Sequence, residues 1–112
     1  MTRGKLASKT FRVSAGHLVR TVELKDGRSY TQRCSLEAYK EVAWCLDEHA
    51  DPGATTGTLW EALPDVPCTQ VSVALDFLKE RGCVRIEFRR CFPASGFLFE
   101  DAMVEYHALE IE

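Results

Sequence analysis

The sequence predicts a single α+β domain in which three helices are flanked by extended segments. Apolar residues recur at three- and four-residue steps through the middle of the chain, which is the period of an amphipathic helix. Residues 84–89 instead alternate strictly between apolar and charged side chains, which is the period of a strand. The chain has 112 residues, 46% of them hydrophobic, and this length suits one hydrophobic core but not two.

The N-terminal third is predicted to hold a basic arm followed by a β-hairpin. Residues 1–10 are polar, small and basic, and we expect them to form a flexible arm. In residues 11–33, Leu18, Val22 and Leu24 share one face of a predicted strand. The pair Asp26-Gly27 favours a two-residue hairpin turn, after which residues 29–33 form the returning strand.

Three helices are predicted between residues 36 and 81. The first covers 36–49 with Ser35 as its N-cap, and the second follows a cap at Thr55 or Thr56. The third begins near Thr69 and ends at Arg81, because Gly82 suits a left-handed C-cap. Their apolar faces are expected to form the core and comprise Leu36, Tyr39, Val42, Ala43, Leu46, Leu59, Trp60, Leu63, Val71, Ala74, Leu75 and Leu78.

The C-terminal third is predicted to be extended. Residues 83–99 form a hairpin whose turn lies in the loop 92–96, and residues 97–99 resume an extended run. Over 102–111, Val104, Tyr106 and Ala108 alternate with Glu105, His107 and Leu109, which predicts a last strand. No stretch approaches the roughly 18 apolar residues of a membrane span, and no apolar run of a secretory signal follows the N-terminus, so we expect no membrane partner.

The third helix carries a resemblance to a known superfamily. In residues 69–84, a Thr-x-Val-Ser start leads to two leucines three residues apart, then charged residues, a glycine and an apolar residue. This segment resembles the recognition helix of winged helix-turn-helix regulators, and residues 56–63 are similar to their second helix. The likeness covers about residues 35–99. It implies a helix-turn-helix core over 35–82 and a wing over 83–99 within one domain, 11–112. The N-terminal hairpin precedes this core and the strand 102–111 extends the wing.

The resemblance implies sequence-selective DNA binding in transcriptional control, with a dimer matching two half-sites. The third helix would enter the major groove and read bases through Thr69, Gln70, Ser72 and Val73. Phosphate contacts would come from the arm, the helix end and the wing, through Arg3, Lys5, Lys9, Lys79, Arg85, Arg89 and Arg90.

Charge supports a second hypothesis. Residues 1–33 hold eight basic and two acidic residues, a net of +6, whereas residues 34–112 have a net of −9. A basic N-terminal arm suits nucleic acid, but a basic N-terminal strand could equally lie against the acidic C-terminal one. Asp76 would face a polyanion, and the isoelectric point is about 5.6. The alternative is therefore an acidic winged-helix module that binds a protein partner and not DNA.

No residue pattern indicates catalysis, a cofactor or a metal. His17, His49 and His107 lie far apart, and no glycine-rich phosphate loop is present. The five cysteines are odd in number and lack a C-x-x-C pair, which predicts free thiols and a cytoplasmic protein. Cys68 precedes the third helix, and we weigh a redox-sensing role for it against a purely structural one.

Overall fold

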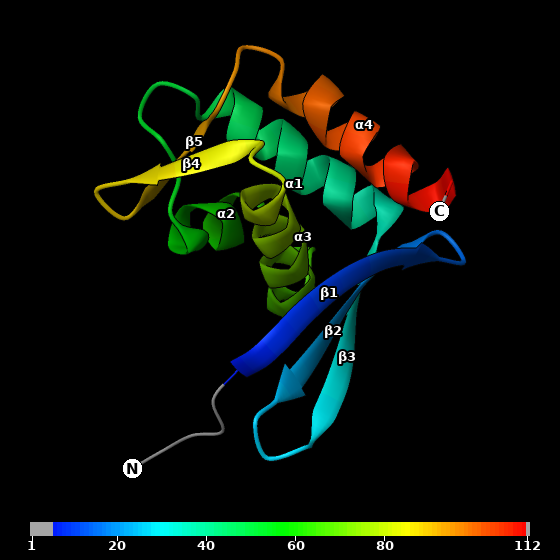
Figure 1. Cartoon of the computed structure of the whole chain (residues 1–112). Helices are drawn as coiled ribbons and strands as arrows, with labels where there is room; N and C mark the ends of the chain where they lie inside the picture. The colour runs from blue at the N-terminus through cyan, green and yellow to red at the C-terminus, as the bar shows by residue number, and fades with distance from the viewer. Residues whose placement is uncertain (1–5, 112) are drawn as a thin grey trace.

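The computed structural model describes residues 6–111 and confirms the α+β class. A three-stranded sheet lies below a group of helices, and a two-stranded hairpin projects to one side (Figure 1). The elements are β1 (Leu6–Ser14), β2 (His17–Leu24), β3 (Ser29–Ser35), α1 (Leu36–Glu48), α2 (Thr56–Ala62), α3 (Cys68–Glu80), β4 (Val84–Glu87), β5 (Arg90–Pro93) and α4 (Leu98–Ile111).

The sheet is an antiparallel meander in the order β1-β2-β3. The predicted hairpin is confirmed as β2–β3. The expected two-residue turn at Asp26-Gly27 is wrong, because residues 25–28 connect the strands and the Gly27 amide donates to the Leu24 carbonyl at 3.0 Å. In this connection Gly27 takes a positive φ of +93° and Asp26 does not. The prediction of a flexible arm is wrong for residues 6–10, because these residues belong to β1 and pair with β2. The rest of the predicted arm, with Arg3 and Lys5, lies outside the described residues. β1 is fixed by its ladder with β2 and by Phe11, whose ring centroid lies 5.2 Å from that of Phe77.

The three predicted helices are present, and the first two begin at the expected caps. Ser35 Oγ accepts a hydrogen bond from the Ala38 amide at 3.1 Å, so it caps α1. Thr55 and Thr58 form a reciprocal capping box at the start of α2. α3 begins one residue earlier than predicted, and Gly82 follows it at φ +75°.

The prediction of a C-terminal strand over 102–111 is wrong, because residues 98–111 form the helix α4. The buried positions of α4 recur at four- and three-residue steps and are Leu98, Ala102, Tyr106 and Leu109. Val104, which the strand pattern places beside Tyr106, is 64% exposed. A helical face is thus present in the sequence but overlaps with a short alternation of polar and apolar residues.

The wing boundaries also need correction. The chain reverses at Phe88 and Arg89, with φ of +52° and +65°, and not in the loop 92–96. Residues 98 and 99 belong to α4, so the hairpin ends at Pro93. Outside the strands, Ala54 forms a bridge with Cys91 and adds a third extended segment beside β5.

One hydrophobic core joins the helices to the sheet. It contains Leu18 and Cys34 from the sheet, Tyr39 from α1 and Tyr106 from α4, all at 0% exposure. Trp60, which we expected in the core, is 45% exposed. Within the described residues, no helix has the length and apolar character that crossing a membrane requires.

All five cysteines are free, and only Cys68 is exposed. Burial raises the pKa of Cys34 to about 12 and that of Cys83 to about 11, and it also raises the pKa values of Cys45 and Cys91. Because the thiolate is the reactive form, Ellman's reagent at pH 8 is expected to titrate one thiol quickly in the folded protein and the other four only after unfolding. Cys68→Ser should remove the fast phase, and a second fast thiol in the wild type would contradict the buried positions.

Candidate functional site

The face of α3 that was expected to read DNA bases packs against the sheet. Val73 is 0% exposed and belongs to the core. The Ser35 amide donates to Gln70 Oε1 at 3.0 Å, and Arg20 Nη1 donates to Ser72 Oγ at 3.5 Å. Thr69 is exposed, but the other three side chains are buried or half-buried by the sheet and its junction with α1. The structure does not bring the four residues together on an open surface.

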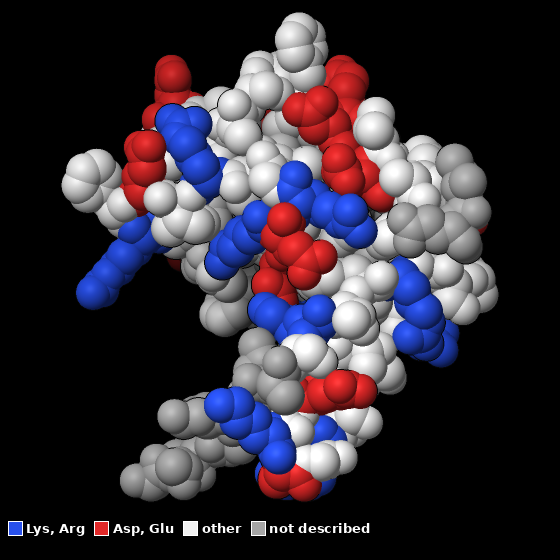
Figure 2. Space-filling view, in the orientation of Figure 1, with Lys and Arg blue, Asp and Glu red and all other residues white. Residues whose placement is uncertain are grey.

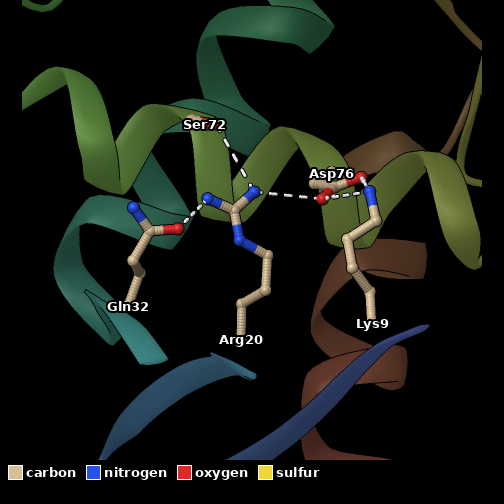
Figure 3. A network of polar contacts seen from close by, with 5 residues as sticks. All are labelled: Lys9, Arg20, Gln32, Ser72 and Asp76. Carbon is tan, nitrogen blue, oxygen red and sulfur yellow. Dashed lines mark hydrogen bonds and ion pairs between the residues drawn. The ribbon is translucent and has the colours of Figure 1, made fainter. Parts of the chain in front are cut away.

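A network of polar contacts joins this face of α3 to the sheet (Figure 3). Lys9 Nζ on β1 lies 2.8 and 2.7 Å from the two carboxylate oxygens of Asp76, and Arg20 Nη1 on β2 lies 3.0 Å from Asp76 Oδ2. Arg20 Nη2 also donates to Gln32 Oε1 on β3. Asp76 therefore does not face an external polyanion, because two cations of the sheet already neutralise it. Because Lys9 lies on β1, the basic N-terminal strand contacts α3. It does not pair with an acidic C-terminal strand.

The apolar residues of α3 carry a sequence signal for this arrangement that the recognition-helix prediction overlooks. α3 has an apolar stripe at Val71, Leu75 and Leu78, and a second one at Val73 and Phe77. The prediction buries the first stripe in the helical core and places Val73 on the outer face. Two apolar stripes on one helix indicate burial on two sides.

The expected phosphate contacts are scattered. Lys9 is committed to Asp76. Arg85 Nη1 donates to the Pro93 carbonyl at 2.8 Å, and Arg90 donates to the carbonyls of residues 52 and 53 at 2.7 and 2.9 Å. Lys79 and Arg89 are exposed, at the end of α3 and at the hairpin turn. The expected contacts are thus distributed over β1, the end of α3 and the hairpin, and Lys9, Arg85 and Arg90 already have partners within the protein.

An apolar groove lies between α1, the end of α2 and the start of α4. Its cavity volume is about 350 Å³. Its apolar walls are Trp44, Cys45, Ala62, Leu63 and Phe99, and its charged or polar rim is Lys40, Glu41, Glu48 and His49. We call it the α1–α2–α4 groove.

Trp44 is the most exposed aromatic wall of this groove. Its side chain is 55% exposed, and its ring meets the Phe99 ring edge-to-face with centroids 5.2 Å apart. Trp44 lies outside the apolar face of α1 that packs in the core, so its exposure could be inferred from the helical period. The groove itself could not be predicted, because the sequence pattern places Phe99 on an extended segment.

The groove contains one thiol, that of Cys45, and one imidazole, that of His49. Burial raises the pKa of Cys45, which lowers its thiolate content, and His49 Nδ1 lies 2.9 Å from the Cys45 carbonyl oxygen. Across residues 6–111, no three His, Cys, Asp or Glu side chains gather in a way that could hold a metal ion. The three histidines lie on β2, after α1 and on α4.

Comparisons with known proteins give no relative: the chain matches no protein-family model, no curated protein and no solved structure. The function therefore has to be inferred from the surfaces of the protein itself.

Proposed function

We propose that this protein is a protein-interaction module that binds a peptide segment of a partner in the α1–α2–α4 groove. The observation that carries the proposal is the half-exposed Trp44, which forms an aromatic wall with Phe99 along a cavity of about 350 Å³. Exposed aromatic residues beside an apolar pocket are the usual energetic centres of protein interfaces. A pocket of this size also falls within the range of ordinary ligand sites.

The rim of the groove favours a basic partner. Two acidic side chains, Glu41 and Glu48, line the groove together with one lysine, Lys40. A segment that places one large apolar side chain in the groove and basic residues around it would match both features. An amphipathic helix has this pattern, and helices dock in apolar grooves of this kind.

The order of α1, α2, α3 and the β4–β5 hairpin supports a winged-helix architecture, as does the bridge between Ala54 and Cys91. We propose that α3 serves here as a core helix and not as a recognition helix, because the sheet packs on its outer face. Winged helices serve as protein-interaction modules as well as DNA readers, so the fold leaves either role open. The free cysteines suit a cytoplasmic location, which stays a prediction.

The groove can be tested with two model peptides of one length, an amphipathic helix of leucine and lysine and its leucine and glutamate counterpart. In a Trp60→Phe background, Trp44 is the sole tryptophan, so its emission reports the groove directly. We expect a blue shift with the lysine peptide and none with the glutamate peptide. Trp44→Ala should weaken lysine-peptide binding by about 30-fold, which corresponds to about 2 kcal/mol for a central aromatic residue.

The matched control is Trp60→Ala, which removes a tryptophan of similar exposure, 45%, that does not line the groove. This control should leave the affinity for the lysine peptide within a factor of two. Equal losses from the two substitutions, measured by fluorescence polarisation of a labelled peptide, would show that the groove is not the binding site.

A further inference from the structure

The sheet has one face packed on α3 and one open face. The register places Arg12, Val19 and Arg33 beside one another on β1, β2 and β3, and alternation puts Arg20 and Leu18 on the opposite face. The open face comprises Ser8, Thr10, Arg12, Ser14, His17, Val19, Thr21, Glu23, Ser29, Thr31 and Arg33. Val19 is only 1% exposed although it lies on this face. Arginine stems can cover apolar surface in this way, and Arg12 and Arg33 are its cross-strand neighbours.

The open face is basic and rich in hydroxyl groups. Arg12 and Arg33 are exposed, and Arg12 Nη1 donates to Thr21 Oγ1 at 3.1 Å. The acid of this face, Glu23, lies near one end and accepts a hydrogen bond from Ser8 at 3.1 Å. Lys25 and Arg28 in the β2–β3 turn extend the basic surface, and Arg28 pairs with Asp26 at 2.7 Å.

This face lies on the basic part of a molecule with segregated charge. Residues 6–35 hold six basic and two acidic residues, a net of +4, whereas residues 36–111 hold six basic and fourteen acidic residues, a net of −8. In Figure 2 acidic side chains gather over the region where Figure 1 shows α4. Lys9 and Arg20 are paired with Asp76, and the four other cations of residues 6–35 still exceed the two acids, so the sheet and its turn suit a polyanion.

We propose that the open face binds the phosphate backbone of a nucleic acid. Arg12 and Arg33 lie two strand spacings apart, about 10 Å, so their guanidinium groups can each donate to a phosphate. Thr10, Thr21 and Thr31 on the same face supply hydroxyl donors. Among the described residues of this face there is no Phe, Tyr or Trp, so it lacks the apolar centre that a protein partner needs.

This site is independent of the groove. The sheet is at the lower end of Figure 1, and the groove is formed by α1, α2 and α4 above it. It also differs from the recognition surface that the sequence predicts, because it uses neither α3 nor the β4–β5 hairpin. Contacts confined to phosphate give binding without sequence preference and with strong salt dependence.

The test is a polarisation titration of a fluorescein-labelled 20-base-pair duplex of mixed sequence at several salt concentrations. Arg12→Gln with Arg33→Gln keeps part of both stems over Val19, and a thermal melt checks that this double variant folds. We expect its slope of log affinity against log salt to be shallower by about 2 units, because each lost phosphate contact removes about 0.9. Trp44→Ala should leave the affinity for DNA unchanged, which separates this site from the groove.

The matched control is Lys79→Gln with Arg89→Gln, which removes two exposed charges from α3 and the hairpin. Its slope should equal that of the wild type. A reduced slope in this control, with an unchanged slope in the sheet variant, would assign binding to the α3 surface and overturn the proposal. Absence of duplex binding at 50 mM salt would also overturn it. So would a salt-sensitive dimer that Arg12→Gln with Arg33→Gln dissociates, because the acidic helices of a second copy would then be the ligand of this face.

Discussion

Asp76→Ala is expected to destabilise the protein by about 3 kcal/mol, because it leaves the buried guanidinium of Arg20 without its carboxylate. Arg20 is only 9% exposed, and Lys9 loses the same partner. The side chain of Asp76 is itself 21% exposed, so the expected loss lies at the lower end of the range for buried ion pairs. Urea denaturation followed by circular dichroism measures the change in the free energy of unfolding.

Asp65→Ala is the matched control for this substitution, because Asp65 is an exposed acid in the loop before α3. Its effect should stay within about 0.5 kcal/mol of zero. A loss of less than about 1 kcal/mol for Asp76→Ala would show that the sheet is not held on α3 by this network. Replacing Asp76, Arg20 and Lys9 together by apolar residues of similar volume should recover most of the lost stability, since no buried charge is then left unpaired.

Phe77→Ala is expected to cost about 3–5 kcal/mol, the range for removing a fully buried aromatic ring. Phe77 is 0% exposed, and its ring centroid lies 5.2 Å from that of Phe11 and 6.0 Å from that of Tyr39. The ring thus fills the space between the sheet and α1, and its loss leaves a cavity that neither element can close alone.

Phe88→Ala removes the same ring from a position that is 94% exposed, so its effect should be within about 0.5 kcal/mol of zero. The two variants remove the same ring, one from the core and one from the exposed hairpin turn, so their difference reports the packing between sheet and helices. A small loss for Phe77→Ala would mean that the sheet does not pack on α3.

The parts of the fold that local chemistry determines were predictable. Ser35 and Thr55 cap the first two helices, Gly82 follows the third, and Gly27 takes a positive φ in the β2–β3 connection, because each needs only its immediate neighbours. α4 was missed because its polar and apolar residues match a helical and an extended period over the same few positions. The first half of β1 was missed because residues 6–10 are mostly small or polar, and their pairing depends on β2.

The candidate site was less predictable than the fold. The resemblance of residues 69–84 to a recognition helix describes the helix but not what packs against it. Whether Asp76 meets solvent, DNA or the protein itself depends on Lys9, which lies 67 residues away in sequence. The groove combines Trp44 with Phe99, and no local pattern relates two helices that are separated by the whole of α2, α3 and the hairpin.

The contact between β1 and α4 has a consequence for the synthesis of the chain. These are the first and last described elements, and both pack into one core with α1 and α3. The Tyr39 hydroxyl on α1 donates to the carbonyl of Ala102 on α4 at 2.6 Å, so the core lacks one wall until that residue has left the ribosome. The β-meander and the helices α1–α3 therefore emerge earlier as an incomplete unit with apolar surface exposed. Shielding of that surface by a chaperone would be needed only until α4 docks.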